Sequence, residues 1–186
     1  MIAGRDRQEA LGLDHPQDSG GTGRTAPAVR RLERTEWPLL REVRLRALRD
    51  APFAFGATHA ETATRDDEFW QASVVRTAWF VAHRGDETVG MVAGLPGDAA
   101  APESRELVSM WVAPSWRGAG VAAELVAAVC RWAQADGAAA VLLSVSEANP
   151  RARRFYERVG FRPTGARQPL RNQPGIDVLE MRRALA

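Results

Sequence analysis

The sequence predicts a single α/β domain built on one mixed sheet. Two observations lead to this fold class. Short apolar runs suited to strands alternate with segments whose apolar residues recur every three or four positions, as in amphipathic helices. Glycine, proline and asparagine stand at the junctions, where turns and helix caps need them. The expected order is strand, two helices, three strands, helix, strand, helix and two strands, which gives about seven strands and about four helices.

The first 27 residues do not follow this pattern. They include DHPQDSGGTGRTAP, which is rich in glycine, serine, aspartate and proline and has no apolar period. Such a composition is typical of a disordered segment. We therefore expect a disordered N-terminal extension over residues 1–27 and the α/β domain over residues 28–186. A mis-assigned start codon is the alternative origin of the extension.

In the first half of the domain, AVRRLER is the candidate first strand. Thr35 is a candidate N-cap for a helix whose leucines and valine repeat at helical spacing up to Asp50. The stretch APFAFGATHAE is expected to be a loop. A second helix begins near Asp66, where the neighbouring acids suit the helix dipole. The strands AWFVAHR and TVGMVAGL then form a hairpin around Gly85-Asp86.

In the second half, ELVSMWVAP is a strand that Pro114 stops. The helix after it carries an apolar stripe and ends at Gly137, a favoured residue just past a helix. The continuous apolar run AVLLSVS fits a buried strand. Asn149 and Pro150 are favoured as N-cap and first helical residue, so they begin the last helix. The final strands are FRPTG and IDVLEMRR, joined by the polar loop ARQPLRNQPG.

Composition excludes several function classes. All 25 basic residues are arginine, which excludes a P-loop lysine and a Schiff-base lysine. The 23 acidic residues lie among the arginines and leave a net charge of +2, which argues against nucleic-acid binding. The single Cys130 excludes an internal disulfide, and three scattered histidines give no reason to expect a metal. Without a long apolar run or a signal peptide, we expect a cytoplasmic protein that does not bind membranes.

The most informative segment, VAPSWRGAGVAAEL, joins a strand to a helix. Gly118 and Gly120 lack a Cβ atom, so the backbone can approach a ligand closely. The free N–H groups of a helix start favour an anion, and the guanidinium of Arg117 matches the geometry of phosphate. The segment therefore predicts a phosphate or pyrophosphate site, with an ordinary strand–helix turn as the alternative. It is neither a Walker loop nor a dinucleotide-binding glycine motif.

Two stretches resemble the GNAT superfamily of acyl-CoA-dependent N-acetyltransferases. The family signature Arg/Gln-x-x-Gly-x-Gly/Ala is similar to RGAGVA at residues 117–122. Its second half is similar to NPRARRFYERVGF at residues 149–161, at the expected separation and in the expected order. The resemblance covers roughly residues 28–183. It implies a single GNAT-type domain whose central sheet is splayed at the cofactor site.

The resemblance also implies acetyl-CoA as co-substrate and no metal. Pantetheine would pair with backbone groups near Met110 and Val112, and Asn149 would contact the pantetheine arm. Asn149 has a second role as an N-cap, and a solvated position at the helix start is the alternative for Arg117. The pyrophosphate would lie on the N–H groups of six consecutive residues: Arg117, Gly118, Ala119, Gly120, Val121 and Ala122.

Two residues are candidates for catalysis. Tyr156, the only tyrosine, is implied as the general acid that protonates the departing thiolate; a place in the core is the alternative. Glu106 is a candidate general base or water-orienting group, and by strand alternation it is expected to share a face with Val108 and Met110. An exposed glutamate at a strand start is the alternative for Glu106.

The resemblance also implies an acceptor site bordered by two loops, residues 51–61 between the first two helices and residues 167–175 between the last two strands. The first loop supplies Phe53, Phe55, His59 and Glu61, and Trp111 is expected to extend the wall. Aromatic side chains with one acid suit an amine that carries an apolar body, although loop packing explains the phenylalanines equally well.

The expected function is therefore transfer of acetyl from acetyl-CoA to a primary amine, on a small molecule or a peptide or protein N-terminus. The alternative is a catalytically weak acyl-CoA-binding regulatory module. The oligomeric state is open, with a homodimer as one option.

Overall fold

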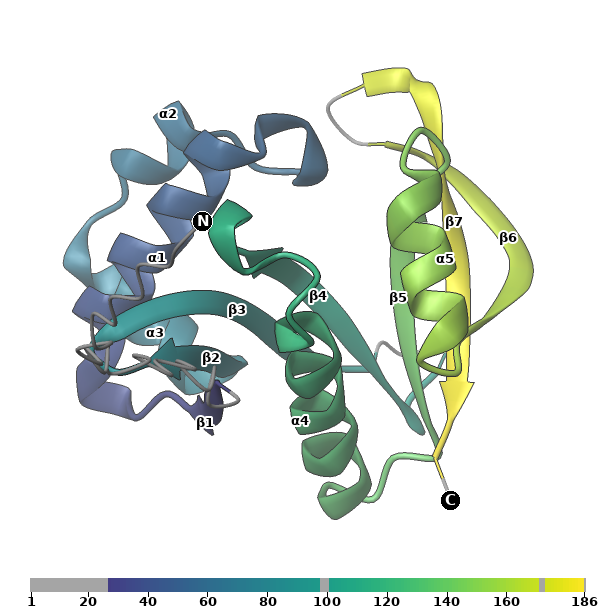
Figure 1. Cartoon of the computed structure of the whole chain (residues 1–186), viewed down its shortest axis with the longest axis horizontal. Coiled ribbons are helices and arrows are strands. Elements are labelled where there is room, and N and C mark those ends of the chain that lie inside the picture. The colour runs from purple at the N-terminus through teal and green to yellow at the C-terminus, as the bar shows by residue number, and fades with distance from the viewer. Residues whose placement is uncertain (1–26, 98–100, 171–172, 186) are drawn as a thin grey trace, which may run out of the picture.

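The computed structural model in Figure 1 describes residues 27–97, 101–170 and 173–185. Its strands form one sheet in the order β1-β2-β3-β4-β5-β7-β6. Among the described strands, β4 and β5 are the parallel neighbours, and the other adjacent pairs are antiparallel. The predicted mixed α/β fold is confirmed. The strands are β1 (Ala28–Arg31), β2 (Ala78–Arg84), β3 (Glu87–Pro96), β4 (Ser104–Val112), β5 (Ala140–Ser146), β6 (Arg162–Leu170) and β7 (Gln173–Ala184).

Helices cover both faces of this sheet, and each face has its own apolar cluster. The first cluster, called here the α1–α3 cluster, includes Leu40, Trp70 and Met91. The second, the α4/α5 cluster, includes Leu125 and Phe161. Among the described residues, no helix is long and apolar enough to cross a membrane. The α-helices are α1 (Trp37–Asp50), α2 (His59–Ala63), α3 (Asp67–Arg76), α4 (Val121–Ala135) and α5 (Pro150–Arg158), and the 3₁₀ turns are η1 (Arg34–Glu36), η2 (Pro52–Ala54) and η3 (Pro114–Trp116).

Several predicted helix boundaries are confirmed by their caps. The Asp66 side chain accepts from the Phe69 N–H and caps α3. Asn149 Oδ1 accepts from the Ala152 N–H at 3.0 Å and caps α5. Gly137 follows α4 with a φ of +75°, a left-handed conformation that favours glycine. These short-range signals are reliable because each cap is made within three or four residues.

Other boundaries differ from the prediction. The N-cap at Thr35 is wrong: η1 occupies that position, and α1 begins at Trp37 after a reciprocal cap between Glu33 and Glu36. The stretch expected to be a loop contains η2 and the short helix α2. Thr58 and Glu61 form the capping box of α2, a Thr-x-x-Glu pattern that was visible in the sequence.

The last hairpin is longer than expected. The polar stretch predicted to be a loop extends both strands, so that β6 reaches Leu170 and β7 starts at Gln173. Backbone pairing of Arg167 with Leu179 and of Pro169 with Asp177 continues the ladder through this polar sequence. Its residues are mostly exposed, and an exposed hairpin does not need the apolar alternation that would reveal it.

Candidate active site

The sheet splits between its two parallel strands. β4 and β5 pair only over Ser104–Glu106 and Ala140–Leu142. Beyond these residues β4 stays paired with β3 and β5 with β7, and Figure 1 shows the two ribbons diverging. The last part of β4 therefore turns one row of backbone groups away from any sheet partner. This arrangement agrees with the splay that the family resemblance implies.

A β-bulge lies in the part of β4 that has separated from β5 and is still paired with β3. The register with β3 shifts between Val108 and Trp111, and Ser109 adopts a φ of +59°. Because of the extra residue, Val108 packs against the α1–α3 cluster and Met110 against the α4/α5 cluster on the opposite face. The expectation that Glu106, Val108 and Met110 share one face is therefore wrong. A serine in a left-handed conformation leaves no mark in the sequence, so alternation alone missed the bulge.

The glycine-rich loop leads into α4 with its backbone uncovered. Gly118 and Gly120 have φ of +85° and +84°, and a Cβ atom added at either would meet nothing within 4 Å. A ligand can therefore approach both residues closely, and any larger residue would be strained there. This open backbone fits a pyrophosphate at the start of a helix.

The free N–H groups of this loop are fewer than expected. The N–H groups of Arg117 and Ala119 donate to carbonyl oxygens of η3, each at 3.3 Å. In the part of the chain that the structure describes, the other four N–H groups have no acceptor, which leaves Gly118, Gly120, Val121 and Ala122 to face an anion.

The side chain of Arg117 already has partners within the protein. Its Nε donates to the Val112 carbonyl at 3.0 Å, and its Nη2 forms an ion pair with Asp50 Oδ2. The Trp111 indole N–H donates to the same oxygen at 2.8 Å. Sequence reasoning missed Asp50. Its signal was an acid in the last turn of a helix, where the dipole disfavours negative charge and some other role is expected.

Tyr156 lies on α5 and is 7% exposed. Its ring contacts Phe155 and Phe161, with centroid distances of 5.1 and 5.7 Å. Burial raises the pKa of its phenol well above the usual value near 10. The residue belongs to the same α4/α5 cluster as Val112 and Val145, which lie on the diverging parts of β4 and β5.

Glu106 lies where the two parallel strands part. It is the last β4 residue paired with β5, opposite Leu142, and its other neighbour across the sheet is Leu95 on β3. The side chain is half-buried. Glu106 therefore lies at the point where β4 and β5 separate, before the bulge at Ser109 in the chain.

Three of the predicted acceptor residues contribute to packing and capping. Phe55 and Trp111 are 7% and 4% exposed and belong to the α1–α3 cluster. The Glu61 carboxylate accepts from the N–H and hydroxyl of Thr58, and these hydrogen bonds lower its pKa. The side chain of Phe53 lies outside the described residues. The sequence therefore identified residues whose folding role is clear and whose acceptor role stays a prediction.

A partly buried cation, Arg44, lies beside this group. The Arg44 guanidinium stacks 4.5 Å from the centroid of the Phe55 ring. Burial lowers its pKa to about 10, and its Nη1 has no hydrogen-bond partner. A charge with an unpaired N–H is costly to bury, so Arg44 is a second residue near the acceptor loop that the sequence did not mark.

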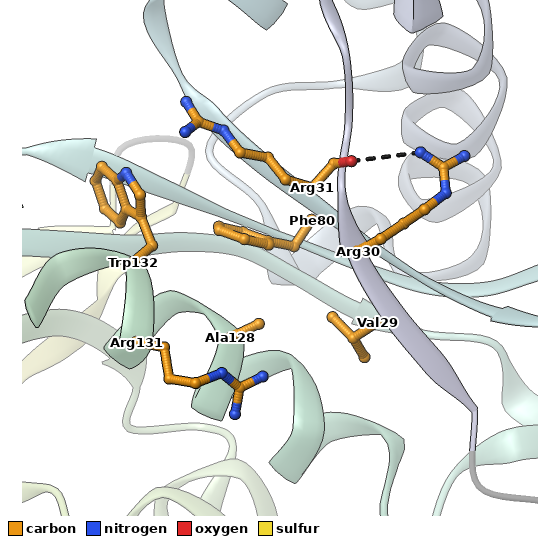
Figure 2. A pocket seen from close by; sticks show the side chains of 7 residues that line it. All are labelled: Val29, Arg30, Arg31, Phe80, Ala128, Arg131 and Trp132. Atoms are coloured by element: carbon orange, nitrogen blue, oxygen red, sulfur yellow. Dashed lines mark hydrogen bonds between the residues drawn. The ribbon is translucent and has the colours of Figure 1, made fainter. Parts of the chain in front are cut away.

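A cavity of about 280 Å³ lies elsewhere, between β1, β2 and α4. Figure 2 shows Phe80, Ala128 and Trp132 on its apolar side, with Arg31 and Arg131 reaching around it. Its α4 residues lie about 10–16 Å along the helix from Val121, at 1.5 Å per residue. The cavity is therefore separate from the glycine-rich loop. The described residues contain no group of three or more histidine, cysteine or acidic side chains placed to hold a metal.

Comparison with known proteins agrees with this geometry. The sequence model of the acetyltransferase (GNAT) family matches residues 31–161. The chain belongs to the GNAT acetyltransferase family. An uncharacterised N-acetyltransferase from Mycobacterium bovis is 35% identical over 92 residues, which is 50% of this chain and 57% of that protein. The chain thus matches little more than half the length of this relative.

Solved structures share the fold at low identity. Ribosomal-protein-alanine N-acetyltransferase from Brucella melitensis superimposes with a TM-score of 0.68 at 21% identity, covering 85% of this chain and 99% of that one. A Salmonella typhimurium acetyltransferase solved with acetyl-CoA gives a TM-score of 0.66 at 16% identity, covering 86% and 94%. At such identities the likeness is one of fold, and the GNAT architecture predicted from the two motifs is confirmed.

Proposed function

We propose that this chain transfers the acetyl group of acetyl-CoA to a primary amine by direct attack of the amine on the thioester. One observation supports the proposal above the others: the open glycine-rich loop at the start of α4 adjoins the end of β4, where that strand has left β5. An anion site and an unpaired strand edge thus lie next to each other in the chain. This combination suits a ligand that has a pyrophosphate at one end and an amide-bearing arm at the other.

The cofactor half would be held mainly by backbone. The N–H groups of Gly118, Gly120, Val121 and Ala122 would bind the pyrophosphate. The unpaired edge of β4 around Met110 would pair with the pantetheine amides. Asn149 would add its side-chain amide, since only its Oδ1 is used in the cap. Arg117 would contribute positive charge once its guanidinium is released from Asp50.

The chemistry would need three proton transfers. The acceptor ammonium must lose a proton before its nitrogen can attack, and Glu106 at the point where β4 and β5 separate would take it directly or through water. The new C–N bond forms and the C–S bond breaks. The thiolate takes a proton from the Tyr156 hydroxyl, and the second proton lost by the acylated nitrogen returns to Tyr156 through water, which leaves a neutral amide. Burial raises the pKa of Tyr156, and the same surroundings would also raise the proton affinity of the released thiolate, which offsets part of the lost acidity.

The same burial supports a second candidate function. A phenol whose pKa is raised is a weaker acid, and a chain that binds acyl-CoA without fast transfer would serve as a regulatory module. The two functions differ in whether thiol is released.

A thiol-release assay with acetyl-CoA tests the proposal. The panel contains primary amines, amino acids, peptides with free N-termini and, for each active amine, its tertiary counterpart, which cannot form a neutral amide. Release with at least one primary amine and none with its tertiary form supports the enzyme. Binding of acetyl-CoA without release across the whole panel supports the regulatory module instead.

A further inference from the structure

One carboxylate connects the two halves of the proposed site. Asp50, the last residue of α1, accepts on Oδ2 from both the Trp111 indole and the Arg117 guanidinium. Arg117 also donates from Nε to the Val112 carbonyl. The contact therefore ties the end of α1 to the end of β4 and to the first residue of the glycine-rich loop.

The chain continues from these residues into different parts of the site. The predicted acceptor loop, residues 51–61, starts directly after Asp50. The predicted pyrophosphate loop starts at Arg117. The Asp50–Arg117 pair thus lies where both loops begin. A change of partner at either residue would therefore affect both the acceptor loop and the pyrophosphate loop.

The Asp50–Arg117 pair is suited to exchange. The two side chains are 23% and 42% exposed, and ion pairs with this much solvent contact are weak. A guanidinium binds phosphate through two parallel hydrogen bonds, which is a stronger arrangement than its single contact with Asp50. The Trp111 indole N–H donates to the same carboxylate, so Asp50 has a second, uncharged partner that does not depend on Arg117.

We propose that Arg117 exchanges partners when acyl-CoA binds, moving from Asp50 to the pyrophosphate and leaving the Asp50 carboxylate to accept the ammonium of the acceptor. The inference rests on the proposed function and deepens it. The exchange makes binding ordered, because the Asp50 carboxylate becomes free for the acceptor ammonium only after acyl-CoA has bound the Arg117 guanidinium. It also favours cationic amines as acceptors. Because breaking a solvent-exposed pair costs about 1 kcal/mol or less, the coupling should change affinity by up to about fivefold.

A double-mutant cycle with and without CoA tests the exchange. Full-length wild type, Asp50→Asn, Arg117→Gln and the double variant are compared by melting temperature, with and without saturating CoA. Asparagine keeps a carbonyl oxygen for Trp111, so the cycle isolates the ion pair. Without CoA the pair should contribute about 1–3 °C of non-additivity. With CoA that non-additivity should vanish.

Arg105 and Asp136 provide the matched control. They form another arginine–aspartate pair between distant segments, with Arg105 Nε 2.7 Å from Asp136 Oδ2. The same cycle on Arg105→Gln and Asp136→Asn should give the same non-additivity with and without CoA. If the Asp50–Arg117 non-additivity also persists unchanged when CoA is bound, the ion pair stays intact in the bound state and the inference is overturned.

Failure of the proposed function has a different signature. If CoA raises the melting temperature of none of the four proteins, acyl-CoA binding itself is absent and both claims fall. A kinetic measurement completes the test: Asp50→Asn should raise the KM of the best cationic amine from the panel at least 10-fold. Its KM for acetyl-CoA should stay within about threefold. Equal changes in both constants would contradict the assignment of Asp50 to the acceptor.

Discussion

The two halves of the proposed site are built from different materials. The cofactor half consists of backbone: two left-handed glycines, four free N–H groups and a bulged strand edge. The acceptor half consists of side chains that also fold the protein, such as Phe55 and Trp111 in a core cluster and Glu61 in a helix cap. A site made of backbone requires particular residues, here glycines, at particular positions. A site made of side chains uses residue types that also occur in cores and helix caps. The backbone site is therefore easier to recognise from the sequence.

Removal of the Tyr156 hydroxyl should have the largest kinetic effect. Tyr156→Phe keeps the ring and its contacts with Phe155 and Phe161, so stability and CoA affinity should change little. Without the proton donor, kcat should fall roughly 10²-fold or more in a steady-state thiol-release assay. Phe155→Leu is the control, since it disturbs the same cluster and keeps the hydroxyl. A kcat for Tyr156→Phe within about threefold of wild type would make Tyr156 a packing residue only.

Glu106 should have a smaller and pH-dependent effect. Glu106→Gln keeps the shape and removes the base. At neutral pH kcat/KM should fall about 10-fold, which is less than the usual acid–base contribution because water partly replaces the base. The loss should shrink as the pH approaches the pKa of the acceptor amine, because the free amine then forms without help. Glu103→Gln, an exposed glutamate just before β4, is the matched control. A pH-independent loss would point to a structural role.

The raised pKa of Tyr156 also predicts how stability depends on pH. The unfolded chain releases the phenol proton near pH 10, while the folded protein retains it because burial raises the pKa. The folded state binds more protons in this range, so the free energy of unfolding falls above about pH 10, by up to about 1.4 kcal/mol per pH unit.

Urea unfolding of wild type and Tyr156→Phe at pH 9 and pH 11 measures this loss. The wild type should lose more stability than the variant between the two values. The chain has no lysine to obscure the comparison, and the other alkaline groups, Cys130 and Arg44, are present in both proteins. An identical decline in both proteins would show that Tyr156 is not the group responsible.

Deletion of the N-terminal extension should have the smallest effect. We propose that residues 1–27 are dispensable, because their composition is that of a linker. A variant starting at Thr25 should melt within a few degrees of the full chain and bind CoA equally well in a thermal-shift assay. A large loss of stability would show that the extension packs on the domain.

The same contrast explains which parts of the molecule were predictable. Caps at Asp66 and Asn149 and the turn at Gly137 depend on a few neighbouring residues, so the elements and their order followed from the sequence. The bulge at Ser109 and the Asp50–Arg117 contact depend on residues from separate segments, and no local pattern marks them. The last hairpin is exposed, so its strands lack the apolar period that identifies buried ones.

The central claim is that the backbone at the start of α4 binds acyl-CoA, and calorimetric titration of CoA tests it most directly. Gly120→Val should abolish binding, because the side chain would stand where the ligand must approach. Gly137→Val imposes a similar strain at a φ of +75° with equally open surroundings, but at the other end of α4. The account predicts one CoA per wild-type chain, retained by Gly137→Val and lost by folded Gly120→Val. Equal binding by all three proteins, or none by wild type, would contradict it.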